Sequence, residues 1–497
     1  MDNKFLKKVS EQVNKINKSV ENYTKIGKIP ALPSRAFVNL ADYLFVRGYY
    51  EKSEELLNNA VDFASNSSDA LLNMGMLKQA AGDFELAHQY YESAINKDKN
   101  NPKPLCFLGN LYSVQEKYDE AISCYEKALK LKSDDPEAYL FWGLVLIKKL
   151  DYKGAREKLK LSVEHHLKDS RAIYMLASVE IELGLYDKAL ERLKFIIAST
   201  ENNVGAYHNM AYVYFKKKDY DKAVECTQVA IKMPQVKVET FLLLGDIYSM
   251  MGDDEKAFLT YKQAEMRGFS SPFLDLAWGI ILQKAKQYEQ AIERYTKGLS
   301  INANDDELFA RLARCYFEIG DYENSKVYMQ KSLDAVGYNY LGMDVLSDLY
   351  IVERRFENAI DCLKICLKNA EAKSRTYLKI ARCMKEIGDF ACSNQNYEHS
   401  IEYDRKNIQT QIEYIKSLNA QEDYQASLKK LITLEKLAKD DLEVLSLLFI
   451  ANYNIAKGNI YGYNGVKAIS VADRIREKYP DSFCFKTEYI ELTQNRG

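Results

Sequence analysis

The chain has 497 residues, of which 47% are apolar and 28% are charged, so it can bury a continuous core and is not an intrinsically disordered polymer. Its 69 Lys and Arg residues nearly balance 71 Asp and Glu residues, which leaves no global field for binding nucleic acid or an anionic membrane. Nine cysteines lie scattered without the close pairs of a zinc site, which favours free thiols in a reducing cytoplasm.

Segments for export or membrane insertion are not expected. The first residues contain no apolar run long enough for a signal peptide, and no run elsewhere approaches the ~18 apolar residues of a membrane span. We therefore expect a cytoplasmic protein without membrane insertion.

Residues 1–34 are predicted to form an amphipathic helix and a linker. Phe5, Val9 and Val13 begin a series of apolar residues at spacings of three or four, which is typical of one face of a helix over residues 3–25. Two roles stay open: this helix caps the apolar end of the segment that follows, or it is a dimerisation or partner helix.

Three columns of similar residues recur every 34 positions through the middle of the chain. The first column is aromatic from Tyr50 to Tyr424, with Asp254 as the exception, and a second column three residues later holds only Ala or Ser. A third column, nine residues before the first, holds Gly, Ala or Ser and fails only at Ile415. Twelve units of 34 residues fill residues 35–442 in one unbroken register, which is the signature of stacked supersecondary repeats.

Each unit is predicted to be a hairpin of two helices. In the unit that begins at Lys103, apolar residues follow helical spacing on both sides of a short polar turn. Gly109 and Ala121 fall where the two helices cross, and Tyr125 is expected to fill the space that their missing side chains leave. Pro136 falls where the next helix starts, a position that needs no backbone N–H.

The unit resembles the tetratricopeptide-repeat family. The run Leu108-Gly109-Asn110-Leu111-Tyr112, followed by Tyr118-Asp119-Glu120-Ala121 and by Ala128, matches the family pattern almost residue for residue. The resemblance covers about four fifths of the chain, although the prolines stand a few residues later than usual and the pattern degenerates after Gln409. It implies an all-α fold, a right-handed superhelical solenoid of antiparallel helix hairpins with about 12 to 13 repeats.

Residues 443–497 are predicted to form a degenerate repeat and a C-terminal capping helix. Its Gly-rich loop, residues 458–465, follows a helix and lacks the Gly-Lys-Ser/Thr ending of a phosphate loop, so we expect no phosphate site there. Self-association through the terminal helices stays open.

The sequence contains no motif of a catalytic, cofactor or metal site. Five histidines lack ligand partners at suitable spacing, and twelve uniform repeats leave no room for a catalytic domain. We expect a non-enzymatic interaction scaffold that needs no cofactor and binds a protein or peptide partner, but no nucleic acid, in its concave groove. Two alternatives are a substrate-selecting subunit of a separate enzyme such as a glycosyltransferase, and a peptide-responsive regulator.

Family geometry places the first helix of each unit on the concave surface, which predicts two stretches of groove. The first is apolar and suits a peptide with an apolar face, unless its side chains only pack on neighbouring first helices. Its residues are Phe107, Leu140, Phe141, Leu144, Tyr174, Met175, Tyr212 and Phe215.

The second stretch is basic and suits acidic segments or chain ends. It resembles the carboxylate clamp of the family's chaperone-tail binders only in part, since Val345 and Ala310 replace two of the clamp's polar residues. An alternative is that Asp344 and Asp348 in the intervening unit neutralise the bases across the stack. The basic residues are Arg311, Arg314, Arg375, Lys379, Arg382 and Lys385.

Overall fold

The computed structural model describes residues 41, 50–63, 68–199, 203–336, 339–368, 373–439, 441–457 and 462–494. Every regular element within these ranges is a helix, and the predicted all-α fold is confirmed. The predicted N-terminal helix and part of the Gly-rich loop lie outside the described residues.

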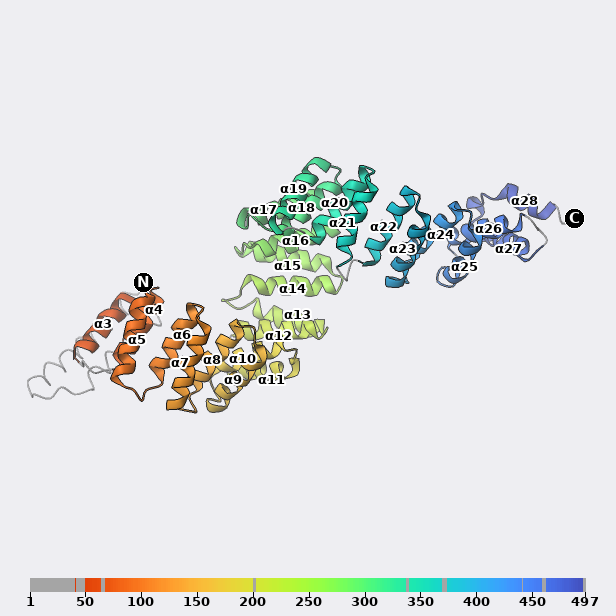
Figure 1. Cartoon of the computed structure of the whole chain (residues 1–497). Helices are drawn as coiled ribbons and strands as arrows, with labels where there is room; N and C mark the ends of the chain where they lie inside the picture. Colours follow the sequence, from red (N-terminus) through yellow and green to blue (C-terminus); the bar gives the residue numbers. More distant parts are fainter. Residues whose placement is uncertain are drawn as a thin grey trace, which may run out of the picture. The chain divides into compact units, whose positions relative to one another are not determined.

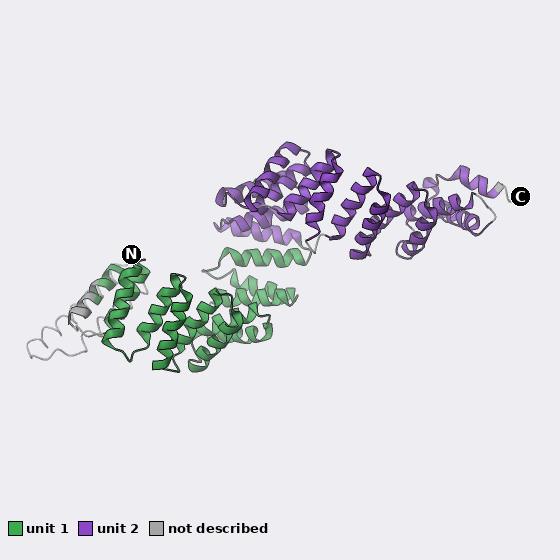
Figure 2. Ribbon diagram, viewed as in Figure 1, with its two compact units in different colours: residues 1–253 green, residues 254–497 purple. Residues whose placement is uncertain are grey.

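The chain divides into two compact units, residues 1–253 and 254–497 (Figure 2). Consecutive helices pack against each other within each unit, as expected for stacked hairpins (Figure 1). The helices of the first unit are α3 (Tyr50–Phe63), α4 (Ser68–Ala80), α5 (Phe84–Lys97), α6 (Lys103–Val114), α7 (Tyr118–Leu131), α8 (Pro136–Lys148), α9 (Tyr152–His165), α10 (Ser170–Glu182), α11 (Tyr186–Ser199), α12 (Val204–Lys216), α13 (Tyr220–Ala230) and α14 (Val238–Met250).

The second unit is built in the same way and ends in a shorter closing segment. Its α-helices are α15 (Asp254–Met266), α16 (Pro272–Lys284), α17 (Tyr288–Ile301), α18 (Asp306–Glu318), α19 (Tyr322–Val336), α20 (Tyr340–Val352), α21 (Phe356–Cys366), α22 (Lys373–Ile387), α23 (Phe390–Tyr403), α24 (Ile408–Ala420), α25 (Tyr424–Glu435), α26 (Leu442–Ala456), α27 (Tyr463–Lys478) and α28 (Lys486–Gln494). A 3-10 helix, Pro480–Ser482, joins the last two, and α28 packs on α27 with Leu492 fully buried.

The repeat columns have the structural roles that the sequence predicts. Residues of the aromatic column begin the second helices, as Tyr118 begins α7, and Pro136 begins α8. Gly109 lies where α6 crosses α7, and a Cβ there would stand only 2.5 Å from Cε1 of Tyr125, whose side chain is fully buried. The absent side chain therefore makes room for a buried tyrosine ring, because atoms at that distance would overlap.

A fourth periodic feature lies in the turns after the first helices, where one residue in each has a positive φ. In the turn between α6 and α7 this residue is Glu116, with φ of 61°, and the next amide, of Lys117, donates to the carbonyl of Tyr112 at 2.9 Å. This is the usual left-handed end of a helix, which favours glycine. The residues in this register are Gly82, Glu116, Leu150, Gly184, Lys218, Gly252, Lys286, Gly320, Arg354, Gly388 and Glu422.

Replacing Leu150 with glycine is expected to stabilise the first unit by about 1 kcal/mol, because a left-handed residue with a Cβ is strained. Leu150 has φ of 60° and is 71% exposed, so its side chain contributes little packing. The urea midpoint measures the change. Leu167→Gly is the control, since Leu167 is 69% exposed but has no positive φ, and an equal gain there would contradict the argument.

Candidate functional site

The predicted apolar groove residues lie on first helices α6, α8, α10 and α12 of the first unit. Phe107 on α6 meets Phe141 on α8 edge to face, with ring centroids 5.7 Å apart, and lies 6.4 Å from the ring of Tyr91 on α5. Both phenylalanines are only partly exposed. The rings therefore pack between neighbouring helices, as the packing alternative describes, while part of each stays accessible.

Leu140 differs from the expectation that it lines the groove. It is only 3% exposed and lies in a core cluster with Leu159 on α9 and Leu176 on α10. Its side chain points between these helices, so it offers no surface to a ligand. Leu144 and Met175 pack against the same cluster but remain partly exposed.

The remaining residues of the apolar stretch are half-buried aromatic side chains. Tyr174 and Tyr212 pack on the core formed by α10 to α12, and Phe215 packs on the core formed by α12 to α14. The ammonium group of Lys216 lies 5.0 Å from the ring centroid of Tyr212. The surface of this stretch is thus a discontinuous row of ring edges.

Four charged side chains from three successive first helices of the second unit form a compact ion cluster. Arg314 on α18 contacts Asp344 at 2.5 Å and Asp348 at 2.6 Å, both on α20. Lys379 on α22 contacts the same two carboxylates at 2.6 and 2.7 Å. Arg375, mostly exposed, lies 3.5 Å from Asp344 at the edge of the cluster.

The charges of this cluster stabilise one another strongly. Burial opposes the ionisation of Asp344, but the positive charges of Lys379, Arg314 and Arg375 outweigh it and hold its pKa below the ordinary value. Burial also opposes the charge of Arg314, yet the two carboxylates raise its pKa above the usual value. The two acids already occupy the donors that a ligand carboxylate would need, which is the neutralised arrangement kept open from the sequence.

The other predicted bases are placed separately. Arg311 pairs with Glu307 on its own helix at 3.1 Å. Arg382 on α22 makes a two-pronged contact with Glu413 on α24, at 2.9 and 2.6 Å, and this hydrogen bonding raises the pKa of the guanidinium. Lys385 is half-buried and has no ion partner among the described residues.

Arg382 and Lys385 line a depression of about 500 Å³ that we call the first-helix recess. Ile351 at the end of α20 and Phe356 at the start of α21 form an apolar wall. Arg354, in the turn between these helices, adds an exposed cation without an ion partner in the described part of the chain. The recess therefore combines an apolar wall with uncommitted positive charge.

Sequence reasoning did not single out three polar residues of this recess, namely Arg354, Glu413 and Lys416. Arg354 belongs to the periodic turn position, where glycine in the neighbouring unit would have drawn attention to the backbone but not to the side chain. Glu413 follows Arg382 by 31 residues, close to one repeat, and this spacing is the signal that predicts contacts between successive first helices.

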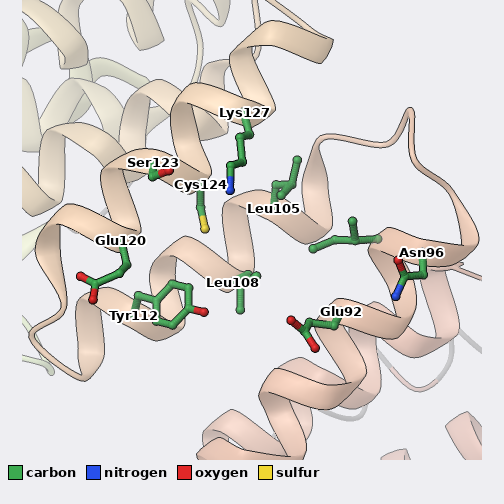
Figure 3. A pocket seen from close by; sticks show the side chains of 10 residues that line it. Glu92, Asn96, Leu105, Leu108, Tyr112, Glu120, Ser123, Cys124 and Lys127 are labelled. Carbon is green, nitrogen blue, oxygen red and sulfur yellow. The ribbon is translucent and has the colours of Figure 1, made fainter.

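A second depression, of about 510 Å³, lies in the first unit between α5, α6 and α7 (Figure 3). We call it the Cys124 recess. Leu105, Leu108 and Tyr112 of α6 form its floor, and Glu92 of α5 stands at its rim. The predicted groove residues do not include any of the side chains that line it.

Searches of the described residues for other sites gave two results. They contain no cluster of three or more His, Cys, Asp or Glu side chains that would hold a metal ion. None of their helices is long and apolar enough to cross a membrane. All nine cysteines are free thiols, and burial raises the pKa of Cys226 to about 11.

Comparison with known proteins agrees with the repeat register. Four family models, each described as a tetratricopeptide repeat, match residues 69–101, 102–135, 204–235 and 282–334. Two of these matches begin three periods of 34 residues apart. They lie in both compact units.

Solved structures with this kind of repeat are also similar. YrrB, a TPR protein with an unusual peptide-binding site, is 24% identical over 37% of this chain and 95% of its own, with a TM-score of 0.31. A tetratricopeptide repeat protein from Parabacteroides merdae is 21% identical over 50% of this chain and 98% of its own, with a TM-score of 0.37. A chain of the APC/C hetero-tetramer Cut9-Hcn1 is 12% identical over 84% of this chain and 96% of its own, with a TM-score of 0.45. With the family models matching inside one unbroken register of helix hairpins, the chain belongs to the tetratricopeptide-repeat family.

Proposed function

We propose that the chain is a non-enzymatic cytoplasmic scaffold that holds a peptide or protein partner against the exposed faces of its first helices. The observation that carries this proposal is the first-helix recess, a depression of about 500 Å³ formed by helices α20 to α24 of one compact unit. Helices that pack on one another present such a surface before the partner arrives, so binding loses little conformational entropy.

The chemistry of the recess suits a segment that carries an acidic and an apolar side chain. Arg354 and Lys385 are cations without ion partners among the described residues, and Val352 beside them is 48% exposed. An extended peptide would place a carboxylate near these cations and an apolar group against Phe356. By contrast, the ion cluster around Asp344 is internally neutral and contributes rigidity to the same face.

The test compares partner binding by charge-reversed variants of the full chain. Arg354→Glu with Lys385→Glu reverses two cations of the recess, and Lys406→Glu with Lys429→Glu makes the same charge change at exposed positions outside it. Each protein is first shown to be folded by circular dichroism. It is then used to capture partners from the native lysate, with stoichiometry measured on purified components.

We expect the wild-type chain and the control variant to bind one stoichiometric partner that the recess variant loses. A partner retained by all three proteins would exclude the recess and move the test to the half-buried rings of Phe141 and Tyr174 in the first unit. If none of the proteins binds a stoichiometric partner, the scaffold proposal itself is wrong.

A further inference from the structure

The Cys124 recess exists because a small residue occupies a register position that holds a long side chain in many other units. Counting from Cys124 in steps of 34 gives Tyr90, Lys158, Arg192, Cys226, Thr260, Arg294, Tyr328, Cys362, Asn396 and Lys430. The long members of this series show what the position does on the second helices. They therefore serve as internal comparisons for the recess.

Two of these long side chains cover the residue 16 positions earlier. The ammonium group of Lys158 lies 3.7 Å from the ring centroid of Trp142, and the guanidinium of Arg294 lies 3.5 Å from that of Trp278. Both are cations stacked on an aromatic face, four repeats apart.

Two others contact the residue 12 positions earlier. Arg192 donates to Glu180 at 2.9 Å, and Tyr328 stacks on Tyr316 with ring centroids 5.4 Å apart and planes within 2°. In the units compared, the same volume is thus filled by an arginine, a lysine or a tyrosine of the chain itself.

At Cys124 the two covered residues are Leu108, 16 positions earlier, and Tyr112, 12 positions earlier. The cysteine side chain is too short to cover both, and the depression of about 510 Å³ is what remains (Figure 3). The thiol is itself only 5% exposed, so it belongs to the wall. The recess has room for one long side chain from another molecule.

Carboxylates stand on two sides of this space. Glu92 comes from α5 and Glu120 from α7, with the hydroxyl of Tyr112 between them (Figure 3). Among the described residues neither glutamate pairs with a lysine or arginine, and the ion contact found for Glu92 is with His88 at 3.8 Å. Lys127 lies across the recess from Glu92 (Figure 3).

We propose that the Cys124 recess receives an arginine or lysine side chain presented by a partner protein. The aliphatic stem would pack on Leu105 and Leu108, and the charged head would lie against the ring of Tyr112 and between the two glutamates. The incoming cation takes the place that Lys158 and Arg294 take in their own units. This site lies in the first unit and is independent of the first-helix recess.

A pair of short labelled peptides tests the proposal with the full chain. One peptide, acetylated and amidated, carries a single arginine between leucine and glycine residues, and its partner replaces arginine with citrulline, which keeps the shape and removes the charge. Fluorescence anisotropy measures binding. We expect the arginine peptide to bind at least about tenfold more tightly, as hydrogen bonds to charged groups are stronger than neutral ones.

Variants of the recess define where the peptide binds. Glu92→Gln with Glu120→Gln should weaken the arginine peptide about tenfold or more, whereas Glu126→Gln, an exposed change on α7 outside the recess, should leave it unchanged. Lys127→Ala should tighten binding because it removes a like charge.

Filling the recess from within gives an independent check. Cys124→Arg copies the side chain that Arg294 provides in its own unit and should abolish peptide binding, while Cys124→Ser should retain it. Equal binding of the citrulline peptide, or binding unaffected by the paired glutamate substitutions, would overturn the proposal, as would absence of binding at millimolar peptide. The paired glutamate variant keeps the test decisive if Cys124→Arg does not fold.

Discussion

Replacing Glu180 with alanine should lower the free energy of unfolding by about 3 kcal/mol, among the largest effects expected for a single charged residue of this chain. The side chain of Glu180 is fully buried on α10 and contacts Arg156 of α9 at 3.4 Å and Arg192 of α11 at 2.9 Å. Without it two guanidinium groups face each other across a cavity. Both arginines are partly exposed, so water relieves part of their repulsion and keeps the cost at the lower end of the usual range.

Urea unfolding followed by circular dichroism measures this loss, and amide hydrogen exchange locates it. Protection should fall first in α9 to α11, since repeat arrays unfold by neighbouring units rather than as one block. Glu182→Ala, an exposed change on the same helix, is the matched control. If the two variants have the same midpoint, the buried ion triad contributes nothing to stability.

Helix pairs were predictable from the sequence because the residues that determine them repeat in place. The register of Gly109 and Tyr125 specifies both the crossing of α6 with α7 and the buried ring that fills it. A helix hairpin depends on contacts within 34 residues of sequence, so local patterns carry most of the information.

The groove was predicted less completely, because register tells which helix face a residue occupies but not which neighbour neutralises it. Arg314 and Lys379 were placed correctly on first helices, yet both are bound to Asp344 and Asp348. The intervening acids were visible in the sequence. Whether long side chains reach them depends on distances between successive helices, which the sequence does not provide.

Leu140 shows the opposite error. A shift of one residue along a helix rotates a side chain by about 100°, which is enough to move it from the surface to the core. Leu140 lies in the core while Phe141, the next residue, reaches the surface. The Cys124 recess was missed because it is defined by what the position lacks relative to its equivalents, such as Arg294.

Replacing Gly279 with alanine should destabilise the second unit by about 2 kcal/mol. A Cβ at this position would stand 2.2 Å from Cε1 of Tyr295, whose ring is fully buried and whose hydroxyl donates to Gln283 at 3.0 Å. The ring cannot retreat without losing that hydrogen bond and its packing. Alanine favours the helix by about 1 kcal/mol relative to glycine, so the overlap must cost more than this gain.

The chain contains its own evidence that the conflict involves a pair of residues. Where the column residue is Ala177, the residue 16 positions later is Leu193, and both are fully buried. Tyr295→Leu should therefore offset part of the damage when combined with Gly279→Ala, although alone it leaves a cavity beside the glycine. A double-mutant cycle on the urea midpoints measures the coupling, expected at about 1 kcal/mol or more in the rescuing direction. Additive effects would mean that the glycine column does not depend on the buried rings, and that helix crossing in this unit is determined by other contacts.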